Sequence, residues 1–284
     1  MIYIPILSAL ALAIGTIMQR KVLKHKKIDI KLYHCGEFLA LTLAMVPFIY
    51  FFWKLSPQAL EPMNLFIFGL VVLFSIIANL LLFFSLKWEK VTNLEPGKVL
   101  EPLFVILLAI VFSFFFTEEL FEKNYNIIIP AIIAGLALVA SHIEKHHLDF
   151  NKYFIAMIFS SFFFALELVI SRLILDFYSP LSFYFLRSIT ILIISVIIFR
   201  PKFSKINKRM RFDFVIIGML WPIYRVSMYW GYEKLGIIST TLLLMLAPIF
   251  LYGISYFYLD KKIKWRNFIA SLIIVACIVY SMFS

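Results

Sequence analysis

Long apolar stretches alternate with short polar segments along the whole chain. Most of the apolar stretches are 17 to 23 residues long, which is the length that an α-helix needs to cross a hydrocarbon core of about 30 Å. Strands of a soluble parallel sheet would be only about four to eight residues long, so the pattern predicts transmembrane helices. Ten spans are expected, at residues 2–19, 32–53, 63–86, 94–116, 127–142, 153–175, 180–199, 212–231, 237–258 and 267–283.

The composition is that of a chain that lies almost entirely in a bilayer. Of the 284 residues, 63% are apolar and 15% are charged, whereas roughly 25% are charged in an ordinary soluble domain. A soluble fold of this size could not bury so much apolar surface. We therefore exclude a soluble enzyme, a disulfide-stabilised secreted domain and a disordered chain. An all-α integral membrane protein, with the lipid bilayer as its surroundings, is expected.

Basic residues are concentrated in alternate loops. The formal net charge is +11, but the lysines and arginines lie in short loops, not in a patch suited to nucleic acid. The loops after the first, third, fifth, seventh and ninth spans carry 21 of the 27 Lys and Arg, and the other loops carry four. The positive-inside rule places the 21 basic residues in the cytoplasm. We therefore predict a multi-pass protein of the plasma (inner) membrane with both termini outside and no nucleic-acid partner.

The charge bias also divides the chain into two halves of opposite orientation, residues 1–145 and 146–284. Each half has five spans, an odd number, so the second half must insert upside down relative to the first. The first loops of the two halves carry six and one basic residues, and the second loops carry one and six. Inverted repeats are typical of alternating-access carriers, which bind substrate near the membrane midplane. The fold predicted is ten transmembrane helices arranged as two inverted five-helix repeats.

This plan, with five plus five helices in fewer than 300 residues, resembles the drug/metabolite transporter superfamily, and specifically its EamA-type members. The resemblance covers the whole chain and implies a transporter. Members of the family usually have cytoplasmic termini, in contrast to the charge bias found here. The local matches are the stretch from Ser179 and Pro180 to Arg187, the prolines Pro102 and Pro248, and the Thr117-Glu118-Glu119-Leu120 ending of the fourth span, whose counterpart after the ninth span is only Asp260-Lys261.

Arg225 is the strongest candidate for substrate binding. An ionisable residue inside a span costs at least a few kcal/mol unless it is paired or hydrated, and Arg225 lies more than a turn from either end of span 212–231. Helical spacing places Trp221 and Tyr229 on the same face, where aromatic rings can stabilise a guanidinium that holds an anionic group. The alternative is an arginine that snorkels to the nearer interface.

The other ionisable residues within the spans are candidates for coupling or gating. Glu167 is either a protonatable coupling group or the ion partner of Arg225 or Arg187. Glu37 and Arg187 occupy equivalent places in the two repeats and lie at opposite depths, as alternate gates would, although Glu37 could equally be interfacial. For Lys98 and Glu101, three residues apart near a helix start, the alternative is an interfacial ion pair.

The predicted site and its chemistry follow from these residues. No metal is expected, because His142 and His146 are spaced i, i+4 at a membrane edge with no third ligand. The predicted substrate-binding residues are Arg225, Trp221, Tyr229, Glu167, Arg187, Gln19 and Asn79, and the predicted coupling or gating residues are Glu167, Glu37, Glu101 and Lys98.

The function favoured is secondary active transport of small organic metabolites, such as amino acids or amphipathic compounds. The sequence has no phosphate loop, and three deep acids balance three deep bases, which suits a zwitterion better than a polyphosphate. The alternatives are a flippase for polyprenyl- or lipid-linked carriers and, less favoured, a membrane-embedded enzyme, which would need deep histidines or a Gly-x-Ser-x-Gly elbow. We expect no enzyme activity and no cofactor, and a monomer or a homodimer.

Overall fold

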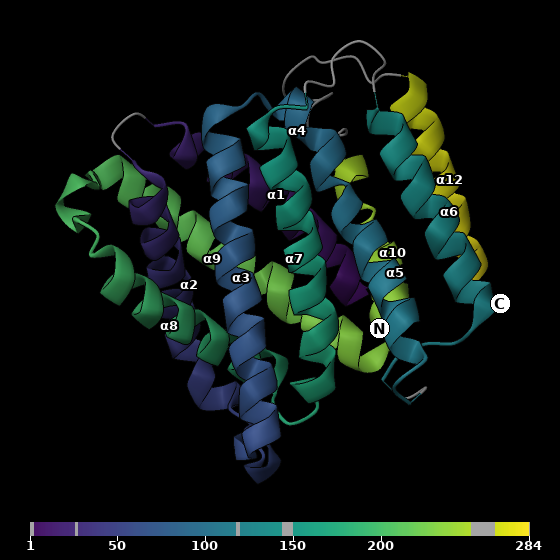
Figure 1. Ribbon diagram of the computed structural model, residues 1–284, viewed down its shortest axis with the longest axis horizontal. Coiled ribbons are helices and arrows are strands. Elements are labelled where there is room, and N and C mark those ends of the chain that lie inside the picture. The colour runs from purple at the N-terminus through teal and green to yellow at the C-terminus, as the bar shows by residue number, and fades with distance from the viewer. Residues whose placement is uncertain (1–2, 26–27, 118–119, 144–149, 251–264, 284) are drawn as a thin grey trace.

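The computed structural model describes residues 3–25, 28–117, 120–143, 150–250 and 265–283. Within these residues the secondary structure is helical, and the one strand-like pairing is an isolated antiparallel bridge between Leu55 and Tyr178. The helices, shown in Figure 1, are α1 (Tyr3–Leu23), α2 (Ile30–Phe52), η1 (Pro57–Leu60), α3 (Pro62–Trp88), α4 (Val91–Lys98), α5 (Leu100–Ser113), α6 (Tyr125–His142), α7 (Lys152–Leu175), α8 (Pro180–Phe199), η2 (Phe203–Lys205), α9 (Lys208–Lys234), α10 (Ile237–Leu244) and α12 (Trp265–Phe283).

Eight helical segments of the described chain are long and apolar enough to cross a membrane. They are α1, α2, α3, Asn93–Ser113 (which comprises most of α4 and α5), α6, α7, α8 and α12. Helix α9 is long enough, but Arg225 and Pro222 interrupt its apolar run. Helix α10 begins the shorter apolar segment Ile237–Phe250, and the remainder of the predicted span 237–258 lies outside the described residues. Each of the ten predicted ranges overlaps a helix.

Polar residues just outside the spans start several helices. Each accepts a hydrogen bond from a backbone N–H of the first turn, which has no partner within the helix. In this way Asp29 caps α2, Asn151 caps α7 and Ser179 caps α8. The donor–acceptor distances are 2.7 Å for Leu32 N to Asp29, 3.0 Å for Phe154 N to Asn151, 3.1 Å for Ser182 N to Ser179 and 2.9 Å for Met210 N to Asn207.

The fourth predicted span, 94–116, is not one continuous helix. It breaks at Val99 into α4 and α5, and α5 ends at Ser113. Pro102 has no N–H with which to bond the carbonyl of Lys98, so the helical ladder is interrupted at this point. The break lies between Lys98 and Glu101, both of which line the cavity described below.

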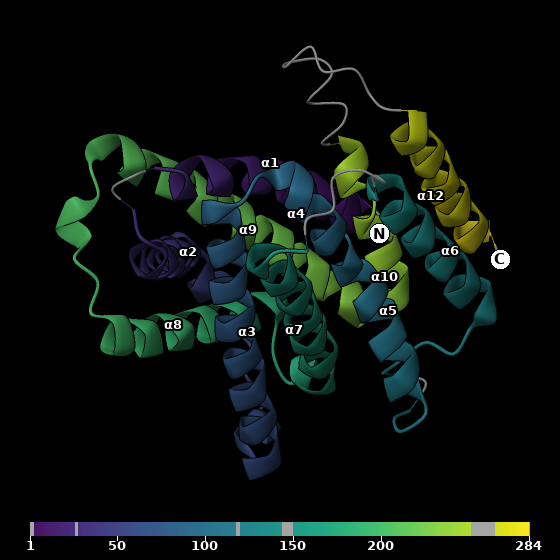
Figure 2. The same ribbon diagram turned by 45° about the horizontal axis from the view of Figure 1, so that its top comes forward.

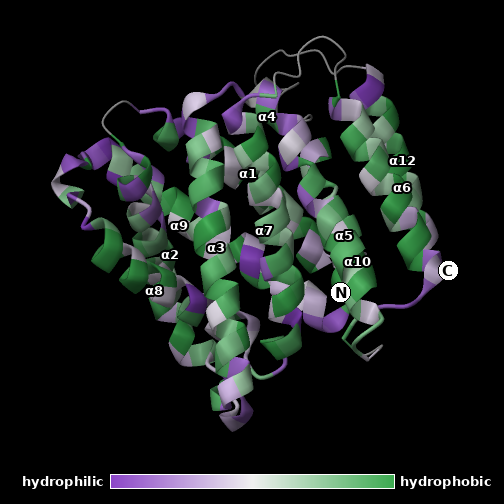
Figure 3. Ribbon diagram, in the orientation of Figure 1, coloured by the Kyte–Doolittle hydropathy of each residue, from purple (hydrophilic) through white to green (hydrophobic). Residues whose placement is uncertain are grey.

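The helices pair mainly between the first and second halves of the chain. Helix α3 packs along α7, α1 along α9, α2 along α8 and α9, α5 along α7 and α10, and α6 along α12. Figures 1 and 2 show α2 and α8 at one end of the molecule and α6 and α12 at the other. Apolar residues run along the helices and hydrophilic residues gather at their ends (Figure 3), as a bilayer requires.

Glycines allow α2 and α9 to approach closely. A Cβ atom added to Gly218 of α9 would lie 2.7 Å from the carbonyl oxygen of Ala40 on α2, and one added to Gly36 of α2 would lie 2.9 Å from the ring of Phe214 on α9. Small residues at such crossings are typical of membrane helices, because van der Waals packing and not burial from water drives their association.

Candidate functional site: a charged cavity between the helices

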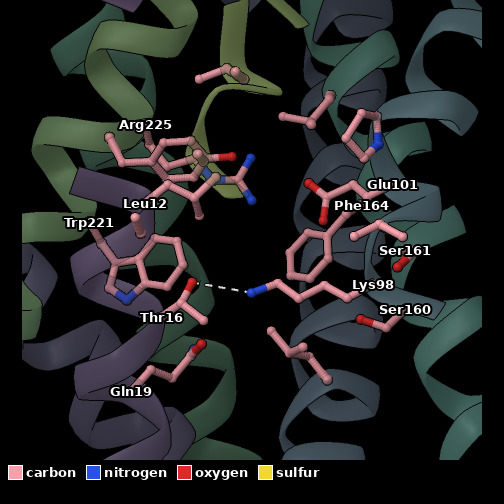
Figure 4. Close-up of a pocket in the computed structure, with 18 of the residues that line it drawn as sticks. Leu12, Thr16, Gln19, Lys98, Glu101, Ser160, Ser161, Phe164, Trp221 and Arg225 are labelled. Atoms are coloured by element: carbon pink, nitrogen blue, oxygen red, sulfur yellow. Dashed lines mark hydrogen bonds between the residues drawn. The ribbon is translucent and has the colours of Figure 1, made fainter. Parts of the chain in front are cut away.

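A cavity of about 380 Å³ lies within the helix bundle. This volume is at the lower end of the range of small-molecule sites, about 300–1,000 Å³. The lining is mainly apolar, with a few polar and charged side chains that point inward (Figure 4). The polar and aromatic lining residues include Thr16 and Gln19 of α1, Glu37 of α2, Lys98 of α4, Glu101 of α5, Ser160, Ser161 and Phe164 of α7, Arg187 of α8, and Trp221 and Arg225 of α9.

The cavity approaches solvent at the end of the molecule that carries the basic loops. There it reaches Arg20 near the end of α1, Glu95 in α4 and His142 at the end of α6, all of which are partly exposed. Toward the opposite end its lining includes Tyr232 and Thr241, whose side chains are buried. The cavity therefore opens toward the basic loops and is closed toward the other side.

Glu167 of α7 is the centre of a buried ion cluster. Its side chain is fully buried, with Oε1 3.3 Å from Arg187 Nε and Oε2 3.5 Å from Arg225 NH1. The hydroxyl of Tyr229 donates a hydrogen bond to Oε1 at 2.8 Å, and Arg187 Nε also donates to Ser75 Oγ at 2.8 Å. The carboxylate is thus the counter-ion of two guanidinium groups at once, whereas the sequence suggested either Arg225 or Arg187 as its ion partner.

Arg225 is 6% exposed and lies in the cavity wall, so it does not snorkel to an interface. Its guanidinium carbon is 5.4 Å from the ring centroid of Phe164 and 5.3 Å from that of Tyr224, within the range of cation–π attraction. These rings, rather than those of Trp221 and Tyr229, stack on the guanidinium. Trp221 lines the cavity, and the Tyr229 hydroxyl binds Glu167 instead.

Lys98 and Glu101 point into the cavity from the two sides of the α4–α5 break (Figure 4). Lys98 Nζ donates a hydrogen bond to Thr16 Oγ1 at 3.1 Å, which joins α4 to α1 across the cavity. Glu101 lies in the electrostatic field of Arg225 and Lys98. In the described part of the chain, Lys98 and Glu101 form no direct ion pair with each other, so both charged ends are available to the cavity.

Glu37 and Gln19 form a second polar contact in the cavity wall. Gln19 Nε2 donates a hydrogen bond to Glu37 Oε1 at 3.3 Å. The other carboxylate oxygen, Glu37 Oε2, and the amide oxygen of Gln19 are buried and accept no hydrogen bond from any described group. Asn79, also in the lining, instead donates to the carbonyl of Ser75 in its own helix at 2.7 Å.

The structure brings together eight of the ten predicted site residues in one lining, and places Glu167 and Tyr229 behind the two arginines. Sequence reasoning missed Phe164, Tyr224 and Thr16, because nothing in their spacing distinguishes them from other residues of apolar helices. Among the described residues there is no group of three or more His, Cys, Asp or Glu side chains that could hold a metal ion; His146 lies outside them.

Comparison with known proteins identifies the second half of the chain. Residues 151–283 match the model of the EamA-like transporter family. This stretch is an EamA domain. The resemblance to the EamA-type branch of the drug/metabolite transporter superfamily is therefore confirmed for these residues. With this domain and its many apolar helices, the chain is an integral multi-pass membrane protein, and members of the EamA family are generally transporters and not enzymes.

The fold extends beyond the matched residues. A protein of known crystal structure is similar over 99% of this chain and 95% of its own, with a TM-score of 0.71 and 15% sequence identity. At that identity the likeness concerns the fold alone. No curated protein matches the chain.

Proposed function

We propose that this EamA protein is a secondary active transporter that moves a small organic solute through the central cavity by alternating access. The observation that carries the proposal is the cavity itself, which is lined by helices of both halves and contains inward-pointing charges in a mainly apolar wall. A site of this kind between two bundles can be exposed to one side of the membrane at a time.

The pairing of helices supports two inverted five-helix repeats, residues 1–145 and 146–284. If the halves are exchanged, α1 packed on α9 becomes α7 packed on α3, and both pairs occur. The pairs α2 with α8, α5 with α10 and α6 with α12 each map onto themselves. A two-fold relation between the halves predicts this set of pairs, and five crossings in each half make the relation an inversion.

The charge bias and the position of the cavity together define a conformation. The cavity opens toward the loops that carry most of the Lys and Arg residues, and these loops are cytoplasmic by the positive-inside rule. We therefore assign an inward-facing state, with both termini outside. The plasma (inner) membrane remains the expected location.

The cavity favours a solute with an anionic or strongly accepting group and an apolar body. Two buried N–H donors in the wall have no hydrogen-bond acceptor among the described groups. They are Trp221 Nε1 and Arg225 NH1, and the latter has only its ion pair with Glu167. Buried donors without acceptors are costly, so a bound carboxylate would stabilise this wall. Amino acids and amphipathic metabolites combine such a group with an apolar part.

A thermal-shift screen of the purified protein against amino acids, nucleosides and amphipathic drugs tests the proposal. A ligand at about 100 times its Kd stabilises the folded state by about 2.7 kcal/mol, so a true ligand raises Tm. We expect Arg225→Ala to abolish this rise. The matched control is Arg211→Ala, an exposed arginine of the same helix, which should retain it.

Two outcomes would contradict the proposal: no compound stabilises the wild type, or Arg225→Ala responds as the wild type does. Stabilisation by polyprenyl phosphates alone would favour the flippase alternative, which requires a lateral opening for a lipid tail. Uptake of the stabilising compound into proteoliposomes completes the test.

A further inference from the structure

The carboxyl groups of Glu37, Glu101 and Glu167 differ in how their charge is balanced. Glu167 contacts two arginines, at 3.3 and 3.5 Å. Glu101 lies in the field of Arg225 and Lys98. Glu37 is 3% exposed, and among the described residues it forms no ion pair. Of the three carboxyl groups, Glu37 is therefore the one whose negative charge no described cation neutralises.

Polar and aromatic groups surround Glu37 on the helices packed against α2. None of them is a lysine or an arginine. Gln19 donates to Oε1 at 3.3 Å, and the hydroxyl of Tyr33 lies close to both the Glu37 carboxyl group and Gln19. Oε2 is buried, and no hydrogen bond of normal geometry reaches it. The neighbouring groups are Gln19 on α1, Tyr33 and His34 on α2, Asn79 on α3, Tyr184 on α8 and Phe214 on α9.

The charged residues of the same helices are engaged elsewhere. The two arginines of the cavity wall, Arg187 and Arg225, cannot neutralise Glu37 without leaving Glu167 unpaired. His34, one turn before Glu37, has its Nε2 bonded to Ser195 Oγ at 2.9 Å. The charged contacts are Arg187 and Arg225 with Glu167, and Lys21 with Asp213 at 2.8 Å. Arg20 lies in the electrostatic field of Glu95.

An isolated carboxylate in a membrane interior is costly, and the cost disappears when the group binds a proton. A protonated Glu37 would gain an O–H donor among neighbours that include the unpaired amide oxygen of Gln19 and the hydroxyl of Tyr33. Because the cavity reaches solvent at the end with the basic loops, water on that side can supply this proton.

We propose that Glu37 carries the coupling proton of the transporter, with Gln19 as its positioning residue, and that Glu167 is a fixed counter-ion. The proposal rests on the transport function proposed above. In the inward-facing state an O–H bond forms at Glu37, with the proton taken from cytoplasmic water. In the opposite state the proton leaves to water on the other side. Glu167 remains the counter-ion of the two guanidinium groups beside it.

Infrared spectroscopy of the purified protein tests the assignment without a known solute. A buried protonated carboxyl group has a carbonyl band that disappears when the pH is raised. We expect the wild type and Glu167→Gln to show this pH-dependent band and Glu37→Gln to lack it. Glu37→Asp, which keeps a carboxyl group, should retain a band with a changed titration midpoint, and this variant remains informative if Glu37→Gln fails to fold.

A band that persists in Glu37→Gln, or that is lost in Glu167→Gln and not in Glu37→Gln, would overturn the assignment. So would a Glu37→Asp protein whose titration is identical to that of the wild type. Glu233→Gln, which removes a partly exposed carboxyl group paired with Lys234, is the control and should leave the band unchanged.

A transport measurement separates this inference from the function on which it rests. With a solute from the thermal-shift screen, proteoliposomes of Glu37→Gln should lose accumulation driven by a pH gradient, and their uptake should no longer vary with pH. Full accumulation in Glu37→Gln would refute the coupling role and leave the transport function standing. If no solute is found, the transport function fails, while the infrared experiment still decides whether Glu37 binds the proton.

Discussion

The ion cluster around Glu167 joins three helices of the second half through one carboxylate. Removing three charges from water is expensive, and their attraction compensates only when the geometry is good and the remaining polar atoms are bonded. Here Tyr229 and Ser75 provide those additional hydrogen bonds. The cluster therefore fixes α7, α8 and α9 relative to one another next to the cavity.

Replacing Glu167 by Gln should destabilise the protein strongly. The substitution leaves Arg187 and Arg225 buried without a counter-ion, and breaking a buried ion pair in this way costs about 3–5 kcal/mol. Thermal unfolding in detergent measures the effect as a lower Tm. Glu233→Gln removes a partly exposed ion pair with Lys234, and should cost no more than about 1 kcal/mol. Equal Tm values for the two variants would refute the structural role of Glu167.

Single residues differ in how far the sequence reveals them. Arg225 could be predicted because a guanidinium interrupts an apolar run, and so could Glu167. Phe164 could not, because it is one of 32 phenylalanines and faces Arg225 only through the packing of α7 beside α9. The lack of an ion partner for Glu37 also could not be predicted. It depends on the packing of other helices, which places their cations next to other groups.

At the scale of helices, the break between α4 and α5 directs charge into the cavity. Its sequence signals are Pro96-Gly97 and Pro102, but prolines are also tolerated in continuous membrane helices. Hydropathy alone therefore predicts one span where the structure has two helical pieces. The positions of spans follow from apolar length, whereas the bends within them depend on which neighbours satisfy the freed carbonyl groups.

The crossing of α2 and α9 should be sensitive to a single methyl group. Gly218→Ala places a Cβ within 2.7 Å of a backbone oxygen of Ala40, and backbone cannot move aside as a flexible side chain can. Overpacking of this kind typically costs about 1–3 kcal/mol. Gly69→Ala is the matched control, because a Cβ there meets nothing within 4 Å.

The measurement for this pair is Tm in detergent, together with the yield of folded protein. We expect Gly218→Ala to lower both and Gly69→Ala to leave stability within about 0.5 kcal/mol of the wild type. A Gly218→Ala protein as stable as Gly69→Ala would show that α2 and α9 do not cross closely at this point.

At the scale of the whole molecule, two contacts join the halves on the side away from the basic loops. Near the Leu55–Tyr178 bridge, Ser56 N donates to the carbonyl of Phe177 at 2.8 Å. On the same side Glu122 accepts hydrogen bonds from the start of α10. These accepted bonds come from Ile238 N at 2.6 Å, Ser239 N at 2.9 Å and Ser239 Oγ at 2.7 Å.

Glu122→Ala should loosen this closed side. The substitution leaves the first N–H groups of α10 without acceptors, so the inward-facing state loses stability relative to the opposite state. A Thr241→Cys reporter in the cavity, with Cys35 and Cys277 replaced by Ser, should then react faster with an impermeant maleimide added from that side. Glu61→Ala, at an exposed glutamate whose side chain makes no cap hydrogen bond, should react at the wild-type rate. Unchanged labelling in Glu122→Ala would contradict the role of this contact in closure.

The general plan of the molecule is more predictable than its assembly. Apolar length and alternating charge place a helix at each expected range, because the bilayer imposes both on the sequence. The pairing of α1 with α9 and of α3 with α7 cannot be recognised in the sequence, because positions that face lipid and positions that face another helix are both apolar. Only the inversion argument anticipated that the halves meet at all.

The interlocking of the halves has a consequence for biogenesis. As the chain leaves the ribosome, α1 and α3 enter the membrane long before their main partners α9 and α7 exist. Until residues 152–234 have been synthesised, Gln19 and Glu37 face lipid or the insertion machinery instead of a finished cavity. Contacts so distant in sequence form late, so the first half matures only when the second half arrives.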